Sequence, residues 1–269
     1  MLRRAILLHL KQNKTASATN LPSKNATTRD ALFSFARSSV PMRRTTTTES
    51  STTSATTKKE NIQSFQEKWE DLINQHPKID LNPCNSDLHP AVTLGALRVD
   101  KTKPKRSLQE AYDPFASCFV CSKQGELNLE TRRTKDRKIL QSKLERGVPE
   151  RFEELPGIIA PGMIASIMAC SGSWHGSIAL MDRAVLARPP LMMLEKIVDF
   201  TAVDVLAPNE KCSVQTEIVS LDEPNFATVK MEMTIGDNTN NNSNSISKET
   251  VCARAVMRFK KIGAVRSIS

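Results

Sequence analysis

Two cysteines, Cys118 and Cys121, form the one Cys-x-x-Cys pair in the chain. Thiolates at this spacing are common zinc ligands, but a tetrahedral structural site takes four ligands. Neither a second such pair nor a pair of histidines follows at usable spacing, and the other cysteines are scattered through a chain that does not look secreted. We therefore expect reduced thiols, a buried apolar role for this pair, no metal site and no cofactor.

A second group of reactive side chains lies between Pro156 and Met181, a stretch without any charged residue. His175 is its one histidine, and a general base is the chemistry that it could supply. A lone histidine in an apolar helix is more often a satisfied core group, and that is the alternative here. Three serines of the stretch have no evident base beside them, so we expect them to have packing roles: Ser166, Ser171 and Ser173.

The same stretch interleaves large apolar residues with alanine, serine and glycine over about twenty residues that contain no proline. A helix that is apolar nearly all round belongs in a core, and small residues let a neighbouring backbone approach closely. A membrane span is the alternative, because the uncharged run is long enough. Its serines and glycines make it too polar for that assignment, and we expect no span.

Most of the positive charge lies in the N-terminal region. Up to Thr57 there are nine Lys or Arg and two acids, which accounts for +7 of the net +9. Residues 1–44 are rich in Ser and Thr as well as in Arg, which predicts a mitochondrial targeting leader, with a plastid leader as the alternative. Residues 45–59 are predicted to be a disordered Ser/Thr-rich linker. The remainder is nearly neutral and gives no support for nucleic-acid binding.

Residues 60–110 are expected to form a helical and irregular extension. Apolar residues recur at helical spacing around Trp69, which predicts an amphipathic helix over 61–76. That helix either packs on the domain or docks on a partner. The basic cluster at 101–106 is expected to be a solvated loop, with phosphate binding as the alternative.

Residues 111–263 are predicted to form one domain with α+β architecture. Two short strands precede the apolar helix, and four strands with alternating polarity follow it. Such alternation indicates an antiparallel sheet with one buried face, and the apolar helix is the only long element able to cover that face. The strands are expected at 126–133, 138–146, 196–206, 211–221, 227–235 and 250–262.

This order of elements resembles the hotdog fold of the acyl-CoA thioesterase superfamily. CFVCSKQGELNLE from Cys118 resembles the CxxCG…GL segment of one thioesterase branch, and FEELPGII from Phe152 resembles its F-x-G-x-P-G-I-V lead-in to the helix. TVCARAVM from Thr250 resembles its closing strand. The resemblance implies an antiparallel sheet wrapped around one central buried helix. It also implies that the backbone N–H groups of Gly162 and Met163 form an oxyanion site for an acyl-CoA or related thioester.

The chain departs from this family at the catalytic positions. The family has His-Gly-Gly at the helix start, where this chain has Ala160, Pro161 and Gly162. Nine residues after that histidine, many members place an aspartate as nucleophile or base, and here the position is Ala169. Alanine can neither attack a carbonyl nor activate water. His175 is the candidate substitute, but it lies six residues beyond Ala169 and therefore on a different side of the helix.

Two functions from different classes remain open. The first is an acyl-CoA thioesterase-like protein that hydrolyses, or formerly hydrolysed, acyl-CoA thioesters. The second is a catalytically inactive hotdog protein that acts as an acyl-CoA-binding or structural subunit of a mitochondrial assembly. The resemblance further implies a homodimer or a dimer of dimers, since pairing would cover an exposed edge strand.

Overall fold

The computed structural model describes residues 54–136, 138–222, 224–236 and 250–264. The leader expected at 1–44 lies outside the described residues, as does most of the linker expected at 45–59. Helix α2, Ser54–Gln75, begins inside that linker, so the prediction of disorder is wrong for 54–59. Extending a helix is much easier than nucleating one, and the predicted amphipathic segment within α2 supplies the nucleus.

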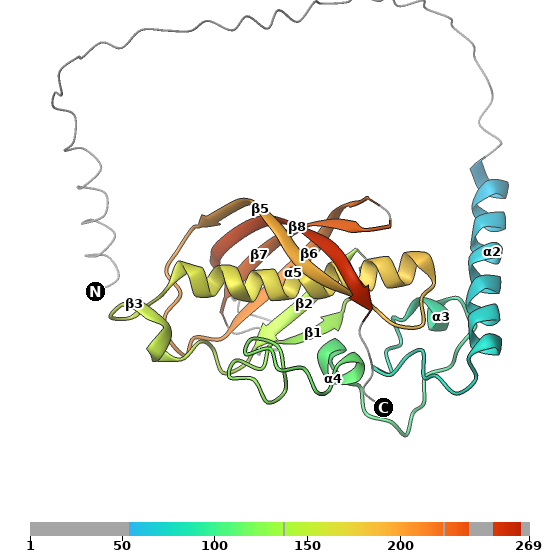
Figure 1. The fold of residues 1–269 in the computed structure, drawn as a ribbon, viewed down its shortest axis with the longest axis horizontal. Helices are drawn as coiled ribbons and strands as arrows, with labels where there is room; N and C mark the ends of the chain where they lie inside the picture. Colours follow the sequence, from blue (N-terminus) through green and yellow to red (C-terminus); the bar gives the residue numbers. More distant parts are fainter. Residues whose placement is uncertain (1–53, 137, 223, 237–249, 265–269) are drawn as a thin grey trace, which may run out of the picture. The chain divides into compact units, whose positions relative to one another are not determined.

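Six strands form one sheet in which every neighbouring pair is antiparallel. Their order is β1-β2-β6-β7-β8-β5, so a short hairpin from before the long helix pairs with the strands that follow it (Figure 1). The alternating sequences predicted this arrangement. The strands are β1 Glu130–Arg133, β2 Ile139–Leu144, β5 Pro190–Ala202, β6 Cys212–Asp222, β7 Phe226–Ile235 and β8 Thr250–Ala264.

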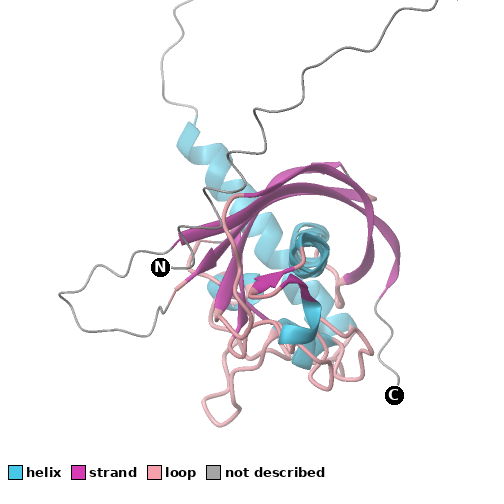
Figure 2. Cartoon of the chain, turned by 90° about the vertical axis from the view of Figure 1, so that its left-hand side faces the viewer, coloured by secondary structure: helices cyan, strands magenta, loops and turns pink. Residues whose placement is uncertain are grey.

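Helix α5, Pro161–Ala184, is the central helix. The sheet curves around it, as the view along the helix shows (Figure 2). Its residues Ile164, Ile167 and Met168 belong to the same buried cluster as the inner faces of β6, β7 and β8. The predicted α+β hotdog fold, an antiparallel sheet wrapped around one central buried helix, is therefore confirmed.

Close approach between α5 and the sheet depends on two glycines. A Cβ added at Gly172 would lie 2.7 Å from the ring of Phe259 and 2.8 Å from Sδ of Met231. A Cβ at Gly176 would lie 3.0 Å from Cβ of Ala227. The small residues predicted to allow tight packing thus face β7 and β8, where larger side chains would push the helix away from the sheet.

The two halves of α5 are buried to different extents. From His175 to Ile178 four consecutive residues are buried, whereas in the first half buried positions alternate with half-exposed ones. The N-terminal extension accounts for the difference. A second apolar cluster joins the extension and its short helix α4 (Leu108–Tyr112) to α5 and β2, and its buried members are Cys84, Leu108, Tyr112, Leu140, Ile178 and Met181.

A chain of buried polar side chains also connects α4, β1, β2 and α5. Gln109 donates from Nε2 to Oγ1 of Thr131 at 2.6 Å and accepts from the Thr131 backbone N–H at 2.9 Å. The Thr131 hydroxyl is 2.8 Å from that of Ser142, and Ser171 of α5 donates to Ser142 at 2.5 Å. Each of these groups would be costly to bury without a partner, and each has one.

Helix α2 packs on the irregular segment that follows it. Trp69 is fully buried, and its ring meets His89 edge to face with centroids 5.1 Å apart. His89 is the N-cap of the short helix α3, Pro90–Thr93, and its Nδ1 accepts from the Ala91 N–H. Of the two alternatives for the Trp69 helix, packing on the rest of the chain is what the structure shows.

Two strands differ in extent from their predictions. β1 begins at Glu130, not near 126, and β5 differs at both ends. β5 begins at Pro190, not near 196, and it ends at Ala202. Its first residues, Pro-Leu-Met-Met-Leu, lack β-branched residues, and their pairing with the end of β8 is a long-range contact. None of the helices that the structure describes is long and apolar enough to cross a membrane.

Substitution of Gly172 should reveal how tightly α5 packs. Gly172→Ala is expected to lower the free energy of unfolding by about 1–2 kcal/mol, because overpacking outweighs the helix propensity of alanine. Gly162→Ala is the matched control, since a Cβ there meets nothing within 4 Å. Urea unfolding measures the free energy of unfolding of the two variants. A Gly172→Ala protein as stable as the Gly162→Ala protein would show that α5 can move away from the sheet without loss of stability.

Candidate functional site

The N-terminus of α5 is the first candidate site. A small hairpin of β3 (Glu153–Leu155) and β4 (Ile158–Ile159) leads into it, after the single 3₁₀ turn Glu150–Phe152. The lead-in is fixed by backbone hydrogen bonds, from Ile159 N–H to the Leu206 carbonyl at 3.0 Å and from Ala160 N–H to the Phe152 carbonyl at 2.9 Å. The helix therefore starts at a defined point of the fold.

No side chain caps this helix start. Ala160 is the N-cap residue, and the first turn carries no acidic residue. Pro161, the first helical residue, has no N–H to satisfy and suits this position by its fixed φ. Alanine is among the poorest N-cap residues, and a Ser or Asp there would stabilise the helix by about 1 kcal/mol. The positive end of the helix dipole is thus left without a compensating side chain.

The two expected oxyanion donors differ in their hydrogen bonds. The Met163 N–H donates to the Ala160 carbonyl at 2.9 Å, and Ile164 donates to the same oxygen at 3.3 Å. Among the residues that the structure describes, the N–H of Gly162 has no acceptor. Gly162 is exposed, and the space where its Cβ would stand is open. The free donor at this end of α5 is therefore that of Gly162, while the N–H of Met163 is engaged.

His175 does not lie near this donor. It is thirteen residues beyond Gly162 on the same helix, which corresponds to about 20 Å along the axis. It is 2 % exposed, and its Nδ1 has no partner among the described residues. Burial, together with the nearby positive charge of Arg133, lowers the pKa of His175 to about 4. The structure places this candidate base in the core between α5 and the sheet.

The three serines of α5 that the sequence singled out all donate to neighbouring groups, as does the fourth, Ser177, to the Pro190 carbonyl. Ser166 donates to the Gly162 carbonyl at 2.8 Å, and Ser173 donates to the Met192 carbonyl at 3.2 Å. Ser171 belongs to the buried polar chain described above. These partners are backbone or structural hydroxyls, which supports the packing roles expected of the serines. Ala169, where the resemblance led us to expect the family's aspartate position, is half-buried and packs against the main core.

Of the basic cluster at 101–106, Lys105 and Arg106 line a cavity of about 230 Å³ together with residues of β1. Three of the cations around it are paired: Lys105 with Asp87 at 3.2 Å, Arg132 with Glu130 at 3.1 Å, and Arg133 with Asp182. In the part of the chain that the structure covers, Arg106 is the lining cation without an ion pair. With most of its charge compensated, this cavity gives little support to phosphate binding.

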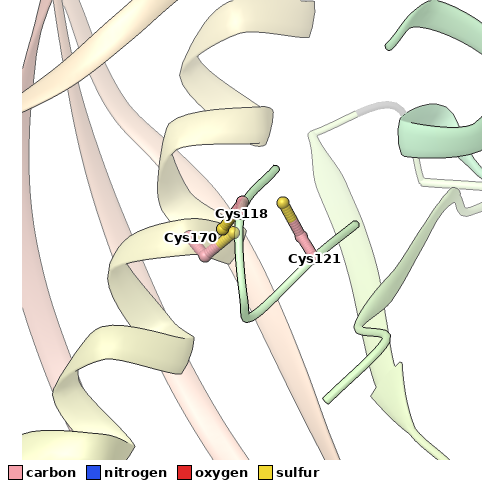
Figure 3. A group of neighbouring side chains, drawn as sticks. All are labelled: Cys118, Cys121 and Cys170. Carbon is pink, nitrogen blue, oxygen red and sulfur yellow. The ribbon is translucent and has the colours of Figure 1, made fainter. Parts of the chain in front are cut away.

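A second candidate site was not expected from the sequence. Cys118 and Cys121 lie on the loop before β1, and Cys170 of α5 meets them (Figure 3). Hydrogen bonds from the thiols of Cys121 and Cys170 lower the pKa of Cys118, and donating those bonds raises the pKa of the two donors. The expectation of no metal site counted only two thiols, because a contact between Cys170 and this loop exists only in the folded chain.

Burial of His175 contributes to the pH dependence of stability, beside His89, whose pKa is lowered to about 3 by burial and by the charge of Arg133. The folded pKa of His175, about 4, lies below the ordinary value of 6.5, so acid protonates the unfolded chain first. Neutral His175 should therefore contribute stability above pH 6.5 that is lost as the pH falls towards 4, by about 2–3 kcal/mol. We expect His175→Gln to flatten the decline in urea midpoint between pH 7.5 and pH 4.5.

His76→Gln is the control for this measurement, since His76 is exposed after α2. It should leave the pH profile of stability unchanged. A His175→Gln protein with the same acid sensitivity as the parent chain would show that His175 is not the group responsible.

Comparison with known proteins gives similarity in fold without a family assignment. No protein-family model matches the chain, and no curated protein matches it by sequence. Among solved structures, a thioesterase from Haemophilus influenzae is similar, with a TM-score of 0.39, 12% identity, and coverage of 55% of this chain and 89% of that one. Zebrafish thioesterase superfamily member 2 has a TM-score of 0.35, 12% identity, and coverage of 55% and 91%.

An acyl-CoA hydrolase from Staphylococcus aureus, solved with butyryl coenzyme A, has a TM-score of 0.35, 12% identity, and coverage of 46% of this chain and 66% of that one. Because these TM-scores and sequence identities are low, the assignment of fold rests on the strand order and on the position of α5 in this chain itself. On that ground the chain has the hotdog fold.

Proposed function

We propose that this chain is an acyl-CoA thioesterase-like protein that binds an acyl-CoA or related thioester at the N-terminus of α5 and does not hydrolyse it. The observation that carries the proposal is the free N–H of Gly162, exposed at the start of an uncapped helix of 24 residues. An N–H group at the positive end of a helix can donate a hydrogen bond to a thioester carbonyl oxygen, and that bond strengthens as negative charge develops on the oxygen.

The absence of hydrolysis follows from the side chains around this donor. Ala160, Pro161 and Ala169 occupy the positions of the family's reactive groups, and none of them can transfer a proton. His175 is buried about 20 Å away along the helix. The oxyanion donor is thus kept while no base accompanies it in the described part of α5. Binding without turnover is the chemistry that remains.

Substitutions at position 162 test the donor directly. Gly162→Pro removes the N–H and should weaken binding of an acyl-CoA to the full chain about tenfold, the value of one hydrogen bond. Gly162→Ala keeps the N–H in open space and should bind within about twofold of the parent. Isothermal titration with acetyl-CoA, octanoyl-CoA and free CoA would measure this, and the loss should be confined to the thioesters.

A capping side chain at position 160 tests the role of the Gly162 N–H independently. Ala160→Asp places an acceptor that can engage the Gly162 N–H, so it should raise the free energy of unfolding by about 1 kcal/mol and weaken thioester binding. Equal binding by Gly162→Pro and Gly162→Ala would contradict the proposed site. Turnover of acyl-CoA by the parent chain, assayed beside Ala160→His/Ala169→Asp, would contradict the proposed lack of hydrolysis.

We also propose that the chain forms a homodimer, or a dimer of dimers, through β5. This strand is an edge of the sheet and is 13 residues long. Long apolar edges promote pairing with another chain. Residues 195–199 are all exposed, and Ile197 and Val198 are 48% and 54% exposed. Antiparallel pairing of two β5 strands about a twofold axis would satisfy their free backbone groups and cover these side chains.

A charge on the edge strand should separate the subunits. Ile197→Lys is expected to convert a dimer to a monomer in light scattering after size exclusion, because the ammonium group would be buried at the junction. Val219→Lys is the matched control, since Val219 is 59% exposed on β6, which is not an edge strand. A parent chain that is monomeric at micromolar concentration would contradict the proposed pairing.

A further inference from the structure

Three thiols from two distant parts of the chain converge on one point. Cys118 and Cys121 come from the loop before β1, and Cys170 comes from the middle of α5 (Figure 3). Their Sγ atoms all lie within 4.8 Å of one another. Cys121 is buried, and Cys118 and Cys170 are partly buried.

The loop that carries two of these thiols has a defined backbone conformation. Ser122 N–H donates to the Cys118 carbonyl at 3.0 Å, and Leu127 N–H donates to the Phe119 carbonyl at 3.1 Å. Gly125 lies so close to this turn that an added Cβ would stand 2.5 Å from the Cys118 carbonyl oxygen. Because no side chain intervenes at Gly125, the turn closes tightly and presents both cysteines on the side that faces α5.

N–H donors surround the sulfur atoms. Hydrogen bonds from the Cys121 and Cys170 thiols, and after them the backbone N–H groups of Cys121 and Val120, lower the pKa of Cys118. The indole N–H of Trp174 donates to Sγ of Cys121 at 3.5 Å. Trp174 is one helical turn after Cys170, so α5 supplies both a thiol and a donor. Such donors stabilise thiolates and orient metal ligands, whereas the sulfurs of a disulfide accept hydrogen bonds only weakly.

We propose that Cys118, Cys121 and Cys170 bind one Zn²⁺ ion through three thiolates, with a water molecule at the fourth position. Zinc–sulfur bonds of about 2.3 Å place the sulfurs of a tetrahedral site about 3.8 Å apart, so a movement of about 1 Å suffices. Three Zn–S bonds form on binding, and each cysteine that was a thiol releases its proton to solvent. The ion would join the loop to α5. This role is separate from the thioester binding that we propose at the N-terminus of α5.

The chemistry of the ligands favours this metal over others. An all-sulfur site excludes Mg²⁺ and Ca²⁺, which take oxygen ligands. A disulfide would use two of the three sulfurs and leave the third without a role, whereas Zn²⁺ uses all of them. Three protein ligands with one open position is also an arrangement that zinc adopts in proteins.

Metal binding to the full chain tests the site. Protein purified under reducing conditions and stripped with a chelator should bind one Zn²⁺ per chain in competition with a chromophoric indicator. Cys170→Ser should weaken binding by roughly 100-fold or more, which exceeds the typical effect of losing an outer hydrogen bond. Trp174→Phe keeps the ring but removes the N–H, and it should weaken binding about tenfold.

Cys252→Ser is the matched control, because Cys252 is a fully buried cysteine whose Sγ donates to the Met233 carbonyl at 3.5 Å, a bond that serine can keep. It should leave zinc affinity unchanged. Co²⁺ in place of Zn²⁺ gives a second readout, since thiolate-to-cobalt absorption should fall by about one third when one of three sulfurs is removed.

Cys118→Ser, on the half-exposed loop, replaces Cys170→Ser if circular dichroism shows that the helix variant does not fold. Three results would overturn the proposal. They are no stoichiometric zinc in the parent chain, zinc affinity that neither cysteine variant changes, and a Cys118–Cys121 disulfide that persists under reducing conditions in place of metal binding.

Discussion

The separation between α5 and the sheet is the constraint on which the rest of the structure depends. Gly172 sets it, because any Cβ there would meet the ring of Phe259 and the sulfur of Met231. At this separation Ser173 reaches the Met192 carbonyl and Ser171 reaches Ser142. A helix held further out would lose these hydrogen bonds and open voids along the whole core, and each void would weaken the fold.

The extent of enclosure changes along α5, from a half that stabilises the fold to a half at which we propose that a ligand binds. Around His175–Ile178 the N-terminal extension and the sheet enclose the helix on all sides. Around Gly162 the helix is exposed, and it lacks the cap that would stabilise it. Proteins commonly retain such unsatisfied groups where a ligand is bound, because a cap that stabilises the helix would also occupy the donor. The enclosed half holds α5 in place, so the exposed half can remain unsatisfied.

Periodicity in the sequence predicted the elements of the fold, and contacts between distant residues set the limits of those predictions. The strands after the helix alternate clearly, and the lack of charge in the run around Met168 predicts a buried helix. The first residues of β5 carry no such signal, since their conformation comes from pairing with β8. In the sequence Cys170 is one of the scattered cysteines, and only the fold brings it to Cys118. The hydrogen bond that engages Met163 depends on local geometry that residue types do not reveal.

The buried polar chain from Gln109 to Ser171 has a consequence for the uniqueness of the fold. An apolar core alone tolerates alternative alignments of β1 on β2, because one hydrophobic side chain packs much like another. A slip of one residue would turn Thr131 and Ser142 away from each other and leave Gln109 and Ser171 buried without partners. The penalty for such orphaned groups falls only on the wrong alignments. These four side chains therefore favour the native alignment of β1 on β2 over misaligned hairpins.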